Sequence, residues 1–159
     1  MAENVQIREY RPDDRDAIMA LAPRLTEGKP LWRDDAAWLA AVQGWIRDAA
    51  DAAGQPGHVV YVAVQNEQVV GLVHAAERAH FTGQVDAYVG ELVTATGLER
   101  RGIARALMAA AEAWAAARGL ANLTLETGAA NHGARAFYAA LGYLEEDVRL
   151  TKKIRTGTG

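Results

Sequence analysis

The stretch that decides the fold is ELVTATGLERRGIARALMAAAEAWAAARG, residues 91–119. Its first residues, 91–95, are mostly apolar and partly β-branched, which predicts a short buried strand. The basic turn RRG follows at 100–102, and apolar residues then recur every three or four positions, at Ile103, Ala106, Leu107, Ala110 and Trp114. That spacing predicts a long helix with one buried face. We therefore expect a strand, a basic turn and a helix in succession.

The start of this helix is suited to binding an anion. A helix N-terminus presents free backbone N–H groups and a partial positive charge, and Arg100, Arg101 and Arg105 add side-chain charges. A phosphate group fits such a combination. The turn lacks the GxxxxGK[ST] pattern of a P-loop, and it has only Gly102 where a dinucleotide fingerprint needs three glycines. From the turn alone, a phosphate site and a basic helix start without a ligand both remain open.

The composition argues against several classes of function. The chain has 159 residues, of which 50% are hydrophobic and 23% charged, as is typical of one globular domain. A net charge of -3 gives no general attraction for nucleic acid, and without cysteine there is no thiol nucleophile or disulfide. The histidines lack the short spacing of metal ligands, so no metal is expected. Neither a signal peptide nor an apolar run of membrane-spanning length is recognised, so we expect a cytoplasmic protein.

Hydrophobic periodicity predicts the order of strands and helices along the chain. Strands are predicted at 5–9, 58–64, 69–75, 85–95, 121–126 and 143–154. Helices are expected after Arg11, from Asp34 or Asp35, from Ile103 and after Asn131. The order β-α-α-β-β-β-α-β-α-β indicates a mixed α+β domain over 1–154, with a largely antiparallel sheet, helices on both of its faces and one parallel strand–helix–strand unit. Residues 155–159 are expected to form a flexible tail.

Two segments in this order resemble a known family. The segment NHGARAFYAALGY, 131–143, resembles the N-x-x-A-x-x-x-Y-x-x-x-G-[FY] pattern of the GNAT superfamily of acyl-CoA-dependent N-acetyltransferases. The segment ERRGIA, 99–104, resembles the same family's acyl-CoA motif, [QR]-x-x-G-x-[GA]. The resemblance covers residues 58–145 and departs at Glu99, where an acid near a pyrophosphate predicts weakened coenzyme binding. It implies a GNAT-like sheet of about six or seven strands.

The resemblance also implies acetyl-CoA as co-substrate and a role for each matching residue. The motif residues around the turn would hold the pyrophosphate: Glu99, Arg100, Arg101, Gly102, Ile103, Ala104 and Arg105. Leu92, Val93 and Thr94 would pair with the pantetheine arm through their backbone, and a backbone N–H there would hold the oxyanion. Asn131 would cap its helix and contact the pantetheine, and Tyr138 would protonate the departing thiolate. Without the family pattern, a core aromatic is the alternative for Tyr138.

An amine nucleophile must lose a proton, so a base is expected near the strand at 85–95. Glu91 is our first candidate, with Asp86, His80 or a water wire as alternatives. Strand alternation places residues 86, 88 and 90 on one face and Glu91 on the other, unless a bulge intervenes, as it often does in the family. A carboxylate that merely pairs with an arginine remains an alternative for Glu91.

The acceptor site is expected to contain Trp32, Trp38 and Tyr88, with aspartates nearby. Aromatic and acidic side chains suit a cationic amine, although for Trp38 packing of its helix onto the sheet is the favoured alternative. We therefore expect an N-acetyltransferase that acts on a primary amine of a small molecule by direct transfer in a ternary complex. The alternatives are a lysine or protein N-terminus as acceptor, an acyl-CoA-binding sensor without turnover, and a nucleotide-binding domain. The apolar strand predicted at 143–154 makes a homodimer a further expectation.

Overall fold

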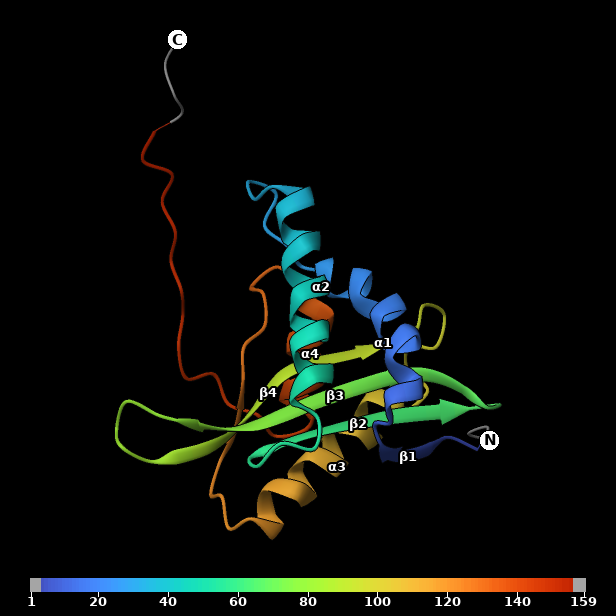
Figure 1. The fold of residues 1–159 in the computed structure, drawn as a ribbon. Helices are drawn as coiled ribbons and strands as arrows, with labels where there is room; N and C mark the ends of the chain where they lie inside the picture. The colour runs from blue at the N-terminus through green and yellow to red at the C-terminus, as the bar shows by residue number, and fades with distance from the viewer. Residues whose placement is uncertain (1–3, 156–159) are drawn as a thin grey trace.

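The computed structural model of the chain describes residues 4–155 (Figure 1). Its strands are β1 (Gln6–Glu9), β2 (His58–Gln65), β3 (Gln68–Ala79), β4 (Val85–Thr94) and β5 (Leu123–Leu125). Its helices are α1 (Arg15–Leu21), α2 (Asp35–Ala52), α3 (Ile103–Ala117) and α4 (His132–Ala140), with 3₁₀ turns η1 (Pro12–Asp14) and η2 (Ala22–Thr26) on either side of α1. Within the described residues, no helix is both long and apolar enough to cross a membrane.

The strands form one sheet in the order β1-β2-β3-β4-β5. Neighbouring strands are antiparallel from β1 to β4, whereas β5 runs parallel to β4 and is reached through α3. The predicted mixed and mostly antiparallel sheet is therefore confirmed, including its parallel unit. Among residues 4–155 the sheet has five strands, slightly fewer than the predicted count of about six or seven.

The missing strand is the one predicted at 143–154. Within the described residues, the segment after α4 has no strand pairing, and in Figure 1 it runs away from the sheet as an extended chain. Its apolar side chains are exposed: Leu144 at 92%, Val148 at 76%, Leu150 at 90% and Ile154 at 81%. The alternation of apolar and polar residues is present, but a strand also needs a neighbour for its backbone hydrogen bonds. Of the predicted tail, residues 156–159 lie outside the described residues.

Helices cover both faces of the sheet, as predicted (Figure 1). On one face, Ile18 of α1 and Ile46 of α2 pack with Val62 and Leu72. On the other face, Leu107 and other residues of α3 pack with Val73 and Val89, and Phe137 and Tyr138 of α4 join this cluster. The buried face of α3 is made by Ile103, Leu107, Met108, Ala111 and Ala115. Ala106, Ala110 and Trp114, which were predicted to belong to this buried face, therefore lie beside it and are only partly buried.

A β-bulge in β4 determines where Glu91 points. Ala75 of β3 pairs with Val89, but the preceding residue, His74, pairs with Glu91, so Gly90 is an extra residue in β4. An extra residue reverses the alternation beyond it. Val89 accordingly packs toward α3, whereas Val93 packs toward α1 and α2. Glu91 therefore shares the α1/α2 face with Tyr88, and the bulge that the sequence left open is present.

Substitution of Gly71 in β3 is expected to destabilise the fold. A Cβ atom there would lie 3.0 Å from the carbonyl oxygen of Val93 and 3.1 Å from Leu107 Cδ1. We expect Gly71→Ala to lower the free energy of unfolding by about 1–3 kcal/mol, because an overpacked core must shift its backbone. The matched control is Gly44→Ala in α2, where a Cβ would have nothing within 4 Å; it should raise the free energy of unfolding by about 0.5–1 kcal/mol. Urea denaturation measures both, and a Gly71→Ala protein as stable as wild type would contradict this packing.

Candidate active site

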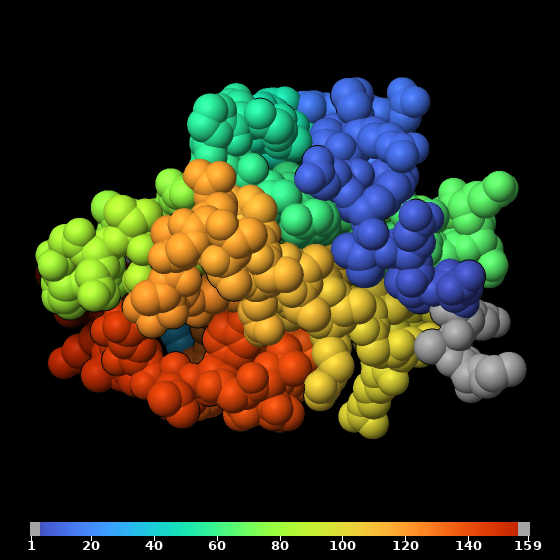
Figure 2. All heavy atoms as spheres, turned by 90° about the horizontal axis from the view of Figure 1, so that it is seen from below, coloured from blue at the N-terminus to red at the C-terminus, as the bar shows by residue number. Residues whose placement is uncertain are grey.

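The second half of β4 has an open edge. β5 pairs with β4 only through Ala87, Tyr88 and Val89. Residues 91–94 pair with β3 on one side and, within the described chain, have no strand on the other. Seen from below, an opening separates the orange residues around the end of α3 and β5 from the red-orange residues of α4 and the segment after it (Figure 2). An exposed strand edge of this kind offers backbone donors and acceptors to an extended ligand, and Leu92, Val93 and Thr94 all lie on it.

The loop after β4 leads into the N-terminus of α3, where the anion site was predicted. Gly102 is the N-cap with a φ of 80°, and Arg100 also has a positive φ, of 62°. The first helical hydrogen bond runs from Ala106 N to the Gly102 carbonyl oxygen, so the N–H groups of residues 103–105 precede the helical ladder. The side chains of Arg100, Arg101 and Arg105 are exposed. These groups have the chemistry to hold a pyrophosphate.

Glu99, the residue that departs from the family motif, is paired with Arg24. One Arg24 nitrogen, Nη2, lies 2.8 Å from Glu99 Oε1, and its Nε donates to the carbonyl oxygen of Thr94 at 3.2 Å. A hydrogen bond from its own backbone N–H lowers the pKa of Glu99, and the charge of Arg24 lowers it further. The acid is therefore ionised but compensated by a cation from the η2 segment. Arg24 also joins the end of β4 to the turn, and sequence reasoning had not singled it out.

Asn131 and Tyr138 lie on α4 as the motif predicts. The Asn131 side chain caps the helix by accepting a hydrogen bond from Ala134 N at 3.1 Å. Gly28 packs against it, since a Cβ at position 28 would lie 2.6 Å from Asn131 Cβ. Tyr138 is half-buried with the rings of Phe137 and Tyr143 at 5.1 and 5.8 Å. Burial raises the pKa of Tyr138 to about 12, so its phenol keeps its proton at neutral pH, as a proton donor must.

The raised pKa of Tyr138 predicts a loss of stability in alkali. An unfolded tyrosine ionises near pH 10, whereas the folded phenol keeps its proton up to about pH 12. The contribution of the protonated phenol to the free energy of unfolding is therefore fully present below pH 10. It is lost as the pH rises toward 12, by about 2–3 kcal/mol in total. Tyr138→Phe lacks this term, so urea denaturation at pH 9 and pH 11 should show wild type losing more stability than the variant. Equal losses would contradict the burial of this phenol.

The three candidate bases occupy different positions. Glu91 is 9% exposed and lies where the edge of β4 opens, with its Oε2 2.8 Å from His74 Nδ1. Asp86 is 5% exposed and accepts a hydrogen bond from Asn122 Nδ2, in the half of β4 that β5 covers. At about 3.3 Å per residue it lies roughly 15 Å along the strand from Glu91. His80 is in the β3–β4 loop, hydrogen-bonded to Thr82. Of these, Glu91 alone lies beside the open edge.

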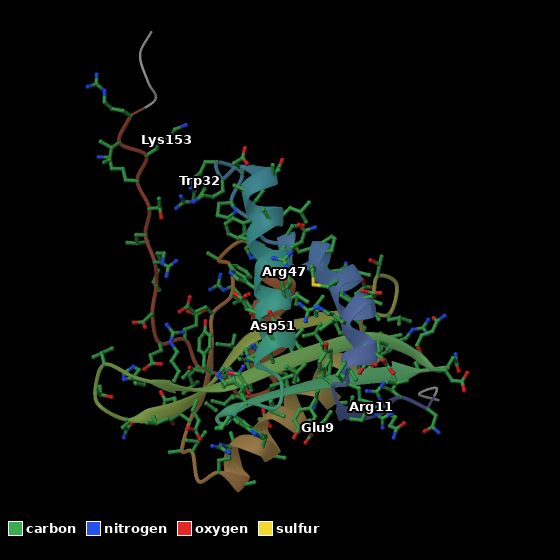
Figure 3. The ribbon with its side chains drawn as sticks, in the orientation of Figure 1. Glu9, Arg11, Trp32, Arg47, Asp51 and Lys153 are labelled. Carbon is green, nitrogen blue, oxygen red and sulfur yellow. The ribbon has the colours of Figure 1, made fainter. Side chains whose placement is uncertain are left out.

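The predicted acceptor residues are spread out. Tyr88 is half-buried on the α1/α2 face beneath the Arg78 guanidinium, which lies 4.2 Å from the ring centre, and burial raises the pKa of its hydroxyl. Trp38, in the first turns of α2, has a buried Nε1 that finds no hydrogen-bond partner in the described part of the chain. Trp32 is 61% exposed in the loop before α2 and points outward (Figure 3). Trp32 therefore does not join Tyr88 in a common pocket in this structure.

No metal site accompanies these groups. Among residues 4–155, the structure places no three His, Cys, Asp or Glu side chains so that they could hold a metal ion. The chemistry available here is a strand edge, an anion-binding helix start, a carboxylate and a phenol. Such a set suits acyl transfer to a nucleophile that needs its proton removed.

Comparison with known proteins agrees with this arrangement. Residues 16–143 match the sequence model of the acetyltransferase (GNAT) family. No curated protein matches the sequence. A putative acetyl transferase from Pyrococcus furiosus has the same fold, with a TM-score of 0.76, 18% identity and coverage of 95% of this chain and 100% of the other. A GCN5-related N-acetyltransferase from Ralstonia eutropha JMP134 gives a TM-score of 0.74 at 19% identity, over 95% and 99% of the two chains.

A third similar structure holds a coenzyme analogue. AAC(6')-Iy, solved with the bisubstrate analog CoA-S-monomethyl-acetylneamine, has a TM-score of 0.69 at 18% identity, over 96% of this chain and 99% of the other. At these identities the structural likeness establishes the fold, and the family match establishes the family. The protein therefore belongs to the GNAT family of acetyltransferases, enzymes that use acetyl-CoA as co-substrate.

Proposed function

We propose that the protein transfers the acetyl group of acetyl-CoA directly to a primary amine of a small molecule in a ternary complex. The observation that carries this proposal is the parting of β4 from β5 after Val89. It leaves a strand edge with Glu91 at its start and the basic N-terminus of α3 beyond its end. An extended thioester ligand with a pyrophosphate at one end suits that succession of groups.

Each residue then has a defined task. The N–H groups of 103–105, with the side chains of Arg100 and Arg105, bind the pyrophosphate, and the backbone of 92–94 together with Asn131 orients the arm that follows it. Acetyl-CoA supplies an acyl group activated as a thioester. Glu91 accepts the proton of the amine, and Tyr138, which is protonated at neutral pH, donates one to the leaving thiolate. Protons are therefore removed and supplied on opposite sides of the reacting carbon.

A small acceptor fits the surroundings of Glu91 better than a polypeptide does. Tyr88 lies near Glu91, whose charge affects its hydroxyl. Aromatic faces and carboxylates attract an ammonium group. Structures with this fold include an aminoglycoside N-acetyltransferase solved with CoA and an aminoglycoside acetyltransferase from an uncultured soil metagenomic sample. A lysine or a protein N-terminus is the second candidate acceptor.

The test is a screen of amines with acetyl-CoA. Release of free CoA thiol is followed with a chromogenic reagent, and each active amine is checked by mass spectrometry for the gain of one acetyl group. Aminoglycosides, polyamines and amino-acid amides represent small acceptors, and lysine-containing peptides represent the alternative. We expect turnover with members of the first group. Turnover confined to peptides would replace the small-molecule proposal, and thiol release without any acetylated amine would contradict amine transfer.

The exposed segment after α4 supports a homodimer. From Leu144 to Ile154 every odd position is polar, and four of the six even positions are apolar, namely Leu144, Val148, Leu150 and Ile154; Glu146 and Lys152 occupy the other two. We infer that these side chains are covered by a second copy of the chain, because an extended segment with exposed apolar side chains and unpaired backbone groups favours pairing. Light scattering after size exclusion should give the mass of a dimer for wild type and of a monomer for a Val148→Asp/Leu150→Asp variant. A monomeric wild type would overturn the inference.

A further inference from the structure

A buried polar chain crosses three strands on the α1/α2 face of the sheet, and no role has been assigned to two of its members. Glu91 Oε2 lies 2.8 Å from His74 Nδ1, and His74 Nε2 lies 3.2 Å from His58 Nδ1. The side chains of His74 and Glu91 are only 14% and 10% exposed. Buried polar groups are found with hydrogen-bond partners, and here each partner is the next residue of the chain. The three residues come from β4, β3 and β2 in turn.

Strand register fixes this arrangement. The bulge at Gly90 places Glu91 directly opposite His74, and Val60 of β2 lies opposite His74 on the other side. His58 is two residues from Val60, so it shares the same face, and its ring lies beside that of His74, with centroids 5.5 Å apart and planes at 9°. A Cβ at position 90 would lie 3.3 Å from His74 Nδ1. Glycine at the bulge therefore leaves room for the imidazole that meets Glu91.

The hydrogen-bonding capacity of each group determines where the protons lie. A carboxylate only accepts hydrogen bonds, so Nδ1 of His74 carries a proton and donates it to Glu91. In a neutral imidazole the other nitrogen is then an acceptor, so Nε2 of His74 accepts from Nδ1–H of His58. With both rings neutral, His74 and His58 are Nδ1–H tautomers, and Nε2 of His58 is the ring nitrogen that this set of hydrogen bonds does not use.

At the end away from Glu91, the row of hydrogen-bonded side chains reaches a cavity at His58. His58 lines a cavity of about 370 Å³ together with residues of β1, α1, α2 and α3. The ionisable groups facing it are Glu9, Tyr10 and Arg15. At the other end, Tyr88 is the ionisable neighbour of Glu91, under Arg78. The three residues thus connect the open edge of β4 with a cavity beside β1 and β2.

We propose that His74 and His58 are positioning residues for Glu91, a proposal that rests on Glu91 being the base of the proposed reaction. His74 holds one carboxylate oxygen, so that the other is directed to the amine at the edge of β4. His58 fixes His74 as the tautomer that donates to Glu91. Holding a base in its productive orientation contributes to the rate because small misplacements cost about 10- to 100-fold. Neither histidine contacts the substrates in this arrangement.

The first test needs no activity. Long-range ¹⁵N–¹H spectra of histidine-labelled protein at neutral pH report the tautomer of each ring. We expect Nδ1–H tautomers for both His74 and His58 in wild type. In His74→Leu, His58 should lose this preference, because its acceptor is gone. An Nε2–H tautomer at His74 in wild type would overturn the proposal, whatever the protein acetylates.

The second test is a matched pair of variants in the acetyl-transfer assay. His74→Leu should lower kcat about 10- to 100-fold, with KM for acetyl-CoA within about threefold of wild type. His74→Asn keeps a donor in the place of Nδ1 and should recover most of the rate. Gly90→Ala, which crowds the imidazole, should show a loss of the same kind. Full activity in His74→Leu would overturn the proposal, and so would a folded His74→Asn no more active than His74→Leu.

The two failures can be told apart. If no amine is acetylated, the proposed function is wrong, but the tautomer spectra still test the hydrogen bonds from His58 through His74 to Glu91. If Glu91→Gln is inactive while His74→Leu is fully active, the assignment of Glu91 as the base stands, and the positioning role of His74 is wrong. Circular dichroism of each variant checks that the fold is intact, and if His74→Leu does not fold, the Gly90→Ala and His74→Asn proteins still decide the outcome.

Discussion

Replacing Tyr138 by phenylalanine is expected to lower kcat by about 100-fold or more, with the affinity for acetyl-CoA unchanged. The phenol is half-buried among aromatic rings and keeps its proton at neutral pH, with a pKa raised to about 12. Loss of the hydroxyl removes the proton donor for the departing thiolate but leaves the ring in place. Steady-state kinetics with saturating amine, together with calorimetric titration of acetyl-CoA, separates the two effects.

The matched control is Tyr143→Phe. The ring of Tyr143 meets that of Tyr138 edge to face with centroids 5.8 Å apart, and its hydroxyl donates to Glu112 at 2.9 Å. Removing that hydroxyl alters the same aromatic cluster away from the proposed chemistry, so kcat should stay within about threefold of wild type. If Tyr138→Phe retained full activity, the assignment of the acid would be wrong. A protein that binds acetyl-CoA without turnover, with or without Tyr138, would instead be a sensor.

Replacing Glu91 by glutamine is the second large effect, and it should depend on pH. The amide has nearly the shape of the carboxylate and can still accept from His74, but it cannot take the proton of an ammonium group. We expect kcat/KM for the amine to fall about 100-fold near pH 7. The deficit should shrink as the pH approaches about 10, where a primary amine is neutral without help. A pH–rate profile from pH 6 to pH 10 measures this change.

Asp86→Asn distinguishes the rival base. Asp86 lies in the half of β4 covered by β5 and already accepts a hydrogen bond from Asn122. Its replacement should reduce the rate far less than that of Glu91. If instead Asp86→Asn lost activity about 100-fold and Glu91→Gln did not, the roles of the two carboxylates would be reversed.

Much of the fold could be predicted because the strands have clear patterns. HVVYVAV and the segments that follow it are apolar or alternating, and burial of those residues holds the sheet together. The strand predicted at 143–154 was wrong for a physical reason. Alternation shows which face of a segment is apolar, but it does not show whether another strand is available to pair with it.

The candidate site was predictable where its signals are local. The Asn131 cap and the basic start of α3 are set by neighbours in sequence, and both are found where they were expected. The partners of these residues are not local. Arg24 meets Glu99, and His74 meets Glu91, only because strands and turns bring distant segments together. The bulge at Gly90 decides the face of Glu91, and an alternation pattern alone cannot reveal such an extra residue.

Calorimetric titration of the purified protein with acetyl-CoA tests the central claim most directly, with ATP and NAD titrated in parallel. The open edge of β4 and the basic start of α3 predict saturable binding of acetyl-CoA, one molecule per chain, in the micromolar range usual for co-substrates. An Arg100→Ala/Arg105→Ala variant should bind it more weakly, whereas Arg47→Ala on the exposed side of α2 should not. Absence of acetyl-CoA binding at millimolar concentration, or tighter binding of ATP or NAD, would contradict the account.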